Sequence, residues 1–212
     1  MKSIDLSHEL RSEMPIYPGD PEVSVETAAT NPEDGYHVCS LALGTHAGTH
    51  VDAPRHVDAA GPTLGDVPLD EFRLDARLAP VDAGAREAIG PDRLPDPDDA
   101  DVLVVRTGWD AEWGTERYFD HPYLTAAAAT WCVENNYHLA VDFLSPDPTP
   151  TANASPSDPS GFPAHERLLG ADRLVFENLT GLDGLPDRFA LRAYPLKIDA
   201  DGAPVRAVAE LD

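Results

Sequence analysis

His46-Ala47-Gly48-Thr49-His50-Val51-Asp52-Ala53-Pro54-Arg55-His56 concentrates three of the chain's eight histidines and an aspartate within eleven residues. Neutral imidazole and carboxylate groups are ligands that suit zinc, manganese or iron. His50 and Asp52 are two residues apart, so they share one face of an extended segment. His46 can join them because Gly48 lets the backbone bend at low cost. The stretch therefore predicts a metal site formed by His46, His50 and Asp52.

His56 has the same parity in the chain, but a fourth protein ligand would close the metal site. Catalytic metals keep one position open for water or substrate. We therefore assign His56 as an acid/base residue beside the metal, since imidazole exchanges protons near neutral pH. Two alternatives stay open at this point: a closed structural zinc site that uses all four side chains, and a cluster without metal.

Two further candidates lie downstream, at His165 and Glu177. His165 begins an expected helix, and Glu177 ends an expected apolar strand, where a carboxylate is costly unless it is paired or metal-bound. Together they can complete a second metal site, with Asp52 or Glu177 bridging two ions. The remaining histidines do not lie in a comparable cluster of possible ligands in the sequence. They are interpreted as structural or surface residues: His8, His37, His121 and His138.

The patterning predicts an α/β or α+β single domain over residues 1–212. Alternation favours half-buried strands at 23–27 and 36–43, and apolar runs favour strands at 102–105, 139–143 and 173–177. Helices are expected at 83–89, 125–136 and 165–169. A closing hairpin would pair 191–198 with 204–211 across Asp199-Ala200-Asp201-Gly202, where the glycine supplies the turn. Residues 145–163 hold six prolines and form either a lid or interface element or a disordered excursion.

The composition excludes several classes of partner. Fifteen basic against 38 acidic residues give a net charge of −23, which argues against binding to nucleic acid or to anionic membranes. Such acidity suits a salt-rich cytoplasm, although a merely acidic protein is the alternative. The N-terminus lacks the apolar stretch of a secretory signal, and the two cysteines are too few for a disulfide framework. We expect a cytoplasmic protein.

The stretch 46–56 resembles the HxGTHxDxPxH signature of the cyclase family of metal-dependent hydrolases, which includes bacterial kynurenine formamidases and isatin hydrolases. Further agreement extends along nearly the whole chain, in the segments Ile4–His8, Tyr17–Asp20, Arg106–Trp109, His121-Pro122, Val141-Asp142, Glu177–Leu179 and Pro204–Ala207. The resemblance implies a swivelling β/β/α domain. It also implies a homodimer or homotetramer in which a neighbouring subunit helps to wall the pocket.

The resemblance implies a role for each candidate residue. His46, His50 and Asp52 would hold one ion, His165 and Glu177 would complete the second, and Asp52 and Glu177 would contact both. His56 would be the proton donor and acceptor. The cofactor would be zinc or manganese, two ions per subunit. Tyr17 would contact the substrate ring, at a position that is typically Trp in bacterial formamidases.

The implied activity is hydrolysis of a carbon–nitrogen bond in a small molecule by hydroxide from metal-activated water, with N-formylkynurenine as the leading substrate and kynurenine and formate as products. The alternative within enzymes is a hydrolase of a cyclic amide or lactone such as isatin. From other classes come a metal-dependent binder of an aromatic acid and an acidic interaction protein with incidental metal binding.

Overall fold

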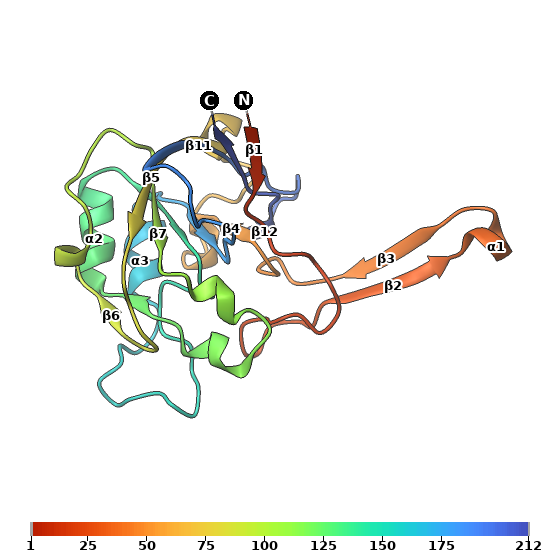
Figure 1. The fold of residues 1–212 in the computed structure, drawn as a ribbon, viewed down its shortest axis with the longest axis horizontal. Coiled ribbons are helices and arrows are strands. Elements are labelled where there is room, and N and C mark those ends of the chain that lie inside the picture. The colour runs from red at the N-terminus through yellow and green to blue at the C-terminus, as the bar shows by residue number, and fades with distance from the viewer. Residues whose placement is uncertain (1, 212) are drawn as a thin grey trace.

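A curled nine-stranded sheet organises the computed structural model, which describes residues 2–211 (Figure 1). Its strand order is β1-β13-β11-β5-β7-β9-β10-β4-β12. The strands are β1 (Lys2–Asp5), β4 (His50–Asp52), β5 (Arg73–Pro80), β7 (Val102–Arg106), β9 (His138–Val141), β10 (Val175–Glu177), β11 (Arg188–Arg192), β12 (Gly202–Pro204) and β13 (Val208–Leu211). Strands β5, β7, β9 and β10 are parallel, and the remaining pairs are antiparallel.

Smaller elements flank this sheet. β2 (Ser24–Ala29) pairs with β3 (Val38–Ala42) around the one-turn helix α1 (Asn31–Asp34). β6 (Ala88–Ile89) pairs with β8 (Tyr123–Leu124). Helices α2 (Ala126–Glu134) and α3 (Pro163–Leu169) pack together against one face of the sheet. Short 3-10 turns occur at Pro54–His56, Leu69–Phe72, Pro91–Arg93, Trp109–Glu112 and Glu116–Asp120.

The central strands are buried on both faces, as a continuous apolar run predicts. In β7, Val102 and Val104 join the core enclosed by the curled sheet, whereas Leu103 and Val105 join the core beneath α2 and α3. The described residues thus form one mixed α/β domain with two large apolar cores, and a third, smaller cluster joins Met14, Val23 and Ala47. The finer assignment to the swivelling β/β/α class stays a prediction, as does the domain boundary at 1–212.

Most expected elements are present with shifted ends. The strands expected at 102–105, 139–143 and 173–177 are β7, β9 and β10, and the helices expected at 125–136 and 165–169 are α2 and α3. Both cysteines are free. Within residues 2–211, no helix combines the length and the apolar character needed to cross a bilayer.

The helix expected at 83–89 is wrong. Gly84 is a poor helix former, and Arg86 adopts a left-handed φ of 53°. The Arg86 guanidinium pairs with Asp158 and donates to the Thr149 carbonyl, which holds residues 145–158 against the body. The end of the segment instead forms β6.

The closing hairpin is only partly as expected. Strands β11 and β13 pair antiparallel, with Leu191 opposite Ala209. Gly202, however, does not supply the turn: it lies in β12 and pairs with Asp52 of β4. β12 pairs with the edge of β4 that faces away from β10. Without this pairing, the backbone groups along that edge would be unsatisfied.

The strands expected to be half-buried at 23–27 and 36–43 exist as β2 and β3, but the second has no buried face. All five residues of β3 are exposed. The two strands project from the body as an arm (Figure 1). We call residues 24–42 the β2–β3 arm.

Candidate metal centre

Strand register brings three acidic and imidazole side chains to one face of the sheet. In β4, Val51 points into the core enclosed by the sheet, so His50 and Asp52 point the other way. In β10, Phe176 likewise points into that core, and Glu177 lies on the face of His50, its direct cross-strand neighbour. Helix α3 covers this face and contributes His165.

The loop before β4 is built to present His46 and His50. Gly48 has a φ of +66°, and a Cβ there would lie 2.9 Å from Leu10 Cδ2. Asn178 holds the same loop: its amide donates to the Gly48 carbonyl, and its own carbonyl accepts from the Thr49 hydroxyl. The glycine and threonine of the signature are thus explained by packing and hydrogen bonding rather than by chemistry.

The predicted ligands converge in two overlapping groups that share Asp52: His46, His50 and Asp52 form one, and Asp52, His165 and Glu177 form the other. Asp52 Oδ1 lies 2.7 Å from His46 Nδ1 and 3.3 Å from His50 Nε2. Glu177 places Oε2 3.1 Å from His50 Nε2 and Oε1 3.1 Å from His165 Nε2. All but His46 are buried. The five residues predicted from sequence therefore meet at one place.

The ring nitrogens that face away from this convergence are anchored. His50 Nδ1 lies 2.8 Å from the Gly48 carbonyl oxygen, His165 Nδ1 lies 2.8 Å from Asp147 Oδ2, and His46 Nε2 lies 2.9 Å from Asp201 Oδ2. A partner on the outer nitrogen fixes the orientation of a metal-ligating imidazole and leaves the inner nitrogen free to bind.

The polar atoms at the centre test whether a cation fits. Six buried side-chain polar atoms of the described residues have no hydrogen-bond partner, and three of them belong to this group: His50 Nε2, Asp52 Oδ2 and Glu177 Oε1. An unpaired buried polar atom is costly. These three atoms carry lone pairs in the neutral imidazole and in the carboxylates, and they belong to two ligand groups that share Asp52. The arrangement therefore fits divalent metal.

Protonation of the histidines balances the buried carboxylates. Burial favours the neutral form of His50, but the Asp52 and Glu177 carboxylates outweigh it and raise its pKa to about 10. Burial also opposes ionisation of Asp52, yet the neighbouring His50 and His46 hold its pKa well below the ordinary value. The pKa of His165 is raised well above its usual range by Asp147, Asp52 and Glu177, against its burial. Metal binding would release these protons.

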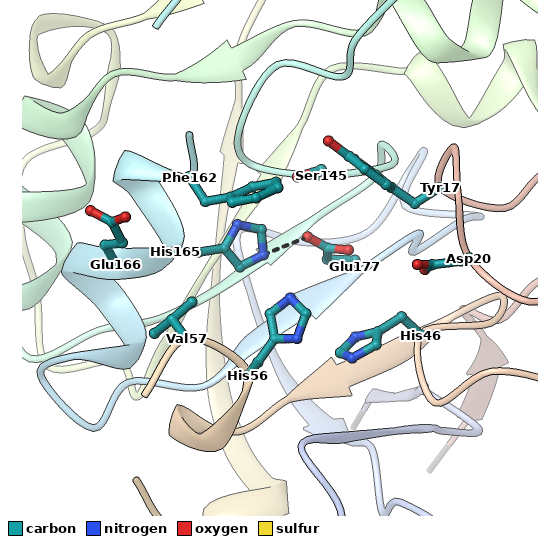
Figure 2. A pocket seen from close by; sticks show the side chains of 10 residues that line it. All are labelled: Tyr17, Asp20, His46, His56, Val57, Ser145, Phe162, His165, Glu166 and Glu177. Carbon is teal, nitrogen blue, oxygen red and sulfur yellow. Dashed lines mark ion pairs between the residues drawn. The ribbon is translucent and has the colours of Figure 1, made fainter. Parts of the chain in front are cut away.

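A cavity of about 380 Å³ opens onto the centre. Figure 2 shows His46 and His56 on one side of it and Tyr17 and Phe162 on the other. The imidazole of His56, whose side chain is 34% exposed, lies 4.1 Å from that of His46 and 5.6 Å from that of His165 by ring centroids. His56 thus borders the predicted ligands from the solvent side.

The other histidines lie outside the centre. His8 stacks on Trp113, and His121 Nε2 lies 2.7 Å from the Thr149 hydroxyl. His138 Nε2 lies 2.9 Å from Glu71 Oε2, and His37 is exposed.

Sequence reasoning missed two carboxylates, Asp147 and Asp201. Asp147 is buried and accepts from the Ala164 and His165 backbone amides as well as pairing with the His165 ring. It lies inside the proline-rich segment, where nothing in the local pattern marks it. Asp201 directly precedes Gly202, and its presumed place in a turn concealed its contact with the centre.

Comparison with known proteins finds relatives along nearly the whole chain. A family model described as "Putative cyclase" matches residues 4–148. The kynurenine formamidase of Salinibacter ruber is 34% identical over 98% of this chain and 97% of its own length. That of Paracidovorax citrulli is 34% identical over 96% of this chain and 94% of its own length.

Solved structures show the same fold. An isatin hydrolase bound to the product analogue thioisatinate superposes with a TM-score of 0.84 at 22% identity, covering 98% of this chain and 91% of that chain. A protein described as a potential metal-dependent hydrolase with cyclase activity gives a TM-score of 0.79 at 23% identity, covering 98% and 96%. With the family model and full-length relatives in agreement, the chain belongs to the cyclase family and is a homologue of kynurenine formamidases.

Proposed function

We propose that this protein is a metal-dependent arylformamidase, which hydrolyses N-formylkynurenine to kynurenine and formate. The observation that carries the proposal is a set of buried ligand atoms on His50, Asp52 and Glu177 that make no hydrogen bond, beside an open cavity. The full-length similarity to kynurenine formamidases supports the choice of substrate.

The donor set favours two divalent ions, zinc or manganese. His46, His50 and Asp52 would hold one ion, and His165 and Glu177 would hold the other together with Asp52. When bound, such ions supply Lewis-acid activation of water and of a carbonyl group. The nitrogen and oxygen ligands without cysteine suit either metal.

His56 is proposed as the acid/base residue. Its imidazole lies at the cavity wall, partly exposed, where a proton can be exchanged with solvent between turnovers. In hydrolysis of a formamide the C–N bond breaks and the leaving amine takes up a proton, which His56 is placed to deliver. A purely binding protein has no use for such a group.

The remaining walls suit an aromatic substrate with a cationic substituent. The Tyr17 and Phe162 rings lie 6.2 Å apart by centroids and offer flat apolar surface for stacking. Asp20 and Glu166 also line the cavity, and among residues 2–211 no lysine or arginine lines it. These carboxylates favour the α-ammonium group of N-formylkynurenine and disfavour anionic ligands.

We also propose that the molecule works as a homodimer or larger homo-oligomer. The β2–β3 arm exposes Tyr36 (58%), Val38 (45%) and Leu41 (57%). A two-stranded ribbon is marginal in water without a packed face. Light scattering coupled to size exclusion would test this state directly.

Formate release from N-formylkynurenine tests the activity. Apo protein reloaded with zinc or manganese should release formate in high salt, and His56→Ala should lower the rate by about 10²–10⁴-fold while both ions stay bound. A full rate in His56→Ala would remove its assigned role. Intact substrate with metal demonstrably bound would discard the formamidase, and turnover of isatin instead would select the cyclic-amide alternative.

A further inference from the structure

Asp201 connects two histidines to which we have given different roles. Its Oδ2 atom lies 2.9 Å from His46 Nε2 and 3.1 Å from His56 Nδ1. Its other oxygen accepts from the Thr45 hydroxyl. One carboxylate therefore contacts both the predicted metal ligand His46, at the nitrogen that faces away from the centre, and the predicted acid/base residue His56, at Nδ1.

The backbone fixes Asp201 at this position. The Ala53 amide donates to the Asp201 carbonyl at 2.8 Å, and the Leu64 amide donates to the Ala200 carbonyl at 2.9 Å. The next residue, Gly202, passes so close to the centre that a Cβ there would lie 2.7 Å from His46 Cε1. The carboxylate is thus carried on a segment held on both sides.

His56 depends on this contact for its orientation. It lies on the short 3-10 turn Pro54–His56, where its side chain is 34% exposed. Within residues 2–211, Asp201 is the only group that hydrogen-bonds the His56 ring. An exposed imidazole without a partner samples several rotamers and both tautomers. A carboxylate at Nδ1 favours the Nδ1–H tautomer and leaves Nε2 as the atom available to substrate.

We propose that Asp201 is a positioning residue, which fixes the tautomer and rotamer of His56 through the Nδ1 hydrogen bond. The inference rests on the proposed role of His56. It adds a carboxylate–histidine pair, in which the carboxylate accepts from one nitrogen while the other exchanges the proton.

The competing role for Asp201 is that of a metal ligand. His46, His56 and Asp201 also form a group of converging ligand atoms. Two features favour the positioning role: Asp201 Oδ2 is already paired with both rings, and its contact with His46 is on the nitrogen that faces away from Asp52.

Asp201→Asn in the metal-loaded full chain tests the proposal, with Asp199→Asn as the matched control. Asp199 lies two residues away and hydrogen-bonds Thr63 rather than a histidine. At saturating metal we expect Asp201→Asn to lower kcat about 10–100-fold, as loss of an outer-sphere carboxylate typically does, with KM unchanged and two ions bound. Excess metal is needed because Asp201 also contacts the predicted ligand His46, so its loss should weaken metal affinity. The double variant His56→Ala/Asp201→Asn should be no slower than His56→Ala alone, and Asp199→Asn should retain wild-type kcat.

Three results would overturn the proposal: an unchanged kcat, loss of a metal equivalent at saturating metal, or a double variant clearly slower than His56→Ala. If the unmodified protein hydrolyses no formamide, the proposed function is wrong. The tautomer of His56 then still tests the positioning role of Asp201. Long-range ¹H–¹⁵N spectra of the zinc-loaded protein should show His56 protonated at Nδ1, and Asp201→Asn should shift it toward Nε2–H. A predominant Nε2–H form in the unmodified protein refutes it.

Discussion

The metal centre and the β2–β3 arm are both built on strands, but the side chains of the centre are covered by the rest of the chain and those of the arm are not. In the centre, Asp52 and His50 lie in a three-stranded neighbourhood of β10, β4 and β12, beneath α3, and are almost completely buried. In the arm, β3 follows an alternating pattern, yet every one of its residues is exposed. Strand periodicity is readable in both regions. Burial follows only where another element of the same chain supplies the covering surface.

This contrast separates local from tertiary information. Alternation fixes which side chains share a face, but it does not say what lies against that face. In the centre the answer is β10 and α3, which come more than a hundred residues later. For the arm we infer that the covering surface belongs to a second copy of the chain. Variants in the centre should therefore lose metal, whereas variants in the arm should lose self-association.

The largest expected effect is in the centre, at Asp52. Replacement by Asn keeps the size of the side chain but removes the charge shared by both ligand groups. We expect loss of bound metal and a drop in kcat/KM of about 10³-fold or more, since Lewis-acid stabilisation is worth several kcal/mol. Metal analysis and formate release measure both. Retention of two ions per chain would contradict the assignment of Asp52 as the shared ligand.

A smaller loss is expected at Asp147, which holds His165 by its outer nitrogen. Asp147→Asn should weaken metal binding about 10–100-fold, as measured by competition with a chromophoric chelator. Asp158→Asn is the matched control, because it lies in the same proline-rich segment but pairs with Arg86. Equal affinities for the two variants would show that Asp147 acts only on the start of α3.

The sequence predicted the centre better than the surroundings of the centre. His46, His50, Asp52 and His56 lie in one short segment, so spacing alone was informative. Asp147 and Asp201 act across large sequence separations and follow no local period. The helix expected at 83–89 failed for a related reason: the pairing of Arg86 with Asp158 is a tertiary contact that overrides local propensity.

The protonated histidines of the centre should make the stability of the apo protein depend on pH. Since the pKa of His50 is raised to about 10 in the folded chain, its contribution is complete below its unfolded pKa of about 6.5 and is lost as pH rises toward 10. Apo protein should therefore melt several degrees lower at pH 9.5 than at pH 7, at about 2–4 °C per kcal/mol.

Metal-loaded protein is the control for this effect, because its ligand histidines are already deprotonated. Differential scanning calorimetry at both pH values should show a smaller difference with zinc bound. An apo protein whose Tm is the same at both values would mean that His50 does not carry a proton in the folded state.

The smallest effect on catalysis, but the most informative for the arm, is expected from Leu41→Glu. If a second copy covers the arm, burying Leu41 contributes about 1.5–3 kcal/mol per copy, and the charge should weaken association by about 100-fold or more while leaving metal content unchanged.

Cys39 lies two residues away on the same face of β3 and is exposed in the single chain, so its maleimide labelling reports coverage. Buried Cys132, whose pKa is raised to about 12 by burial, should stay unlabelled and provides the internal reference. Labelling of Cys39 should be slow in the unmodified protein and fast in Leu41→Glu. Fast labelling in both, together with a monomeric mass by light scattering, would show that no second copy covers this face of the arm.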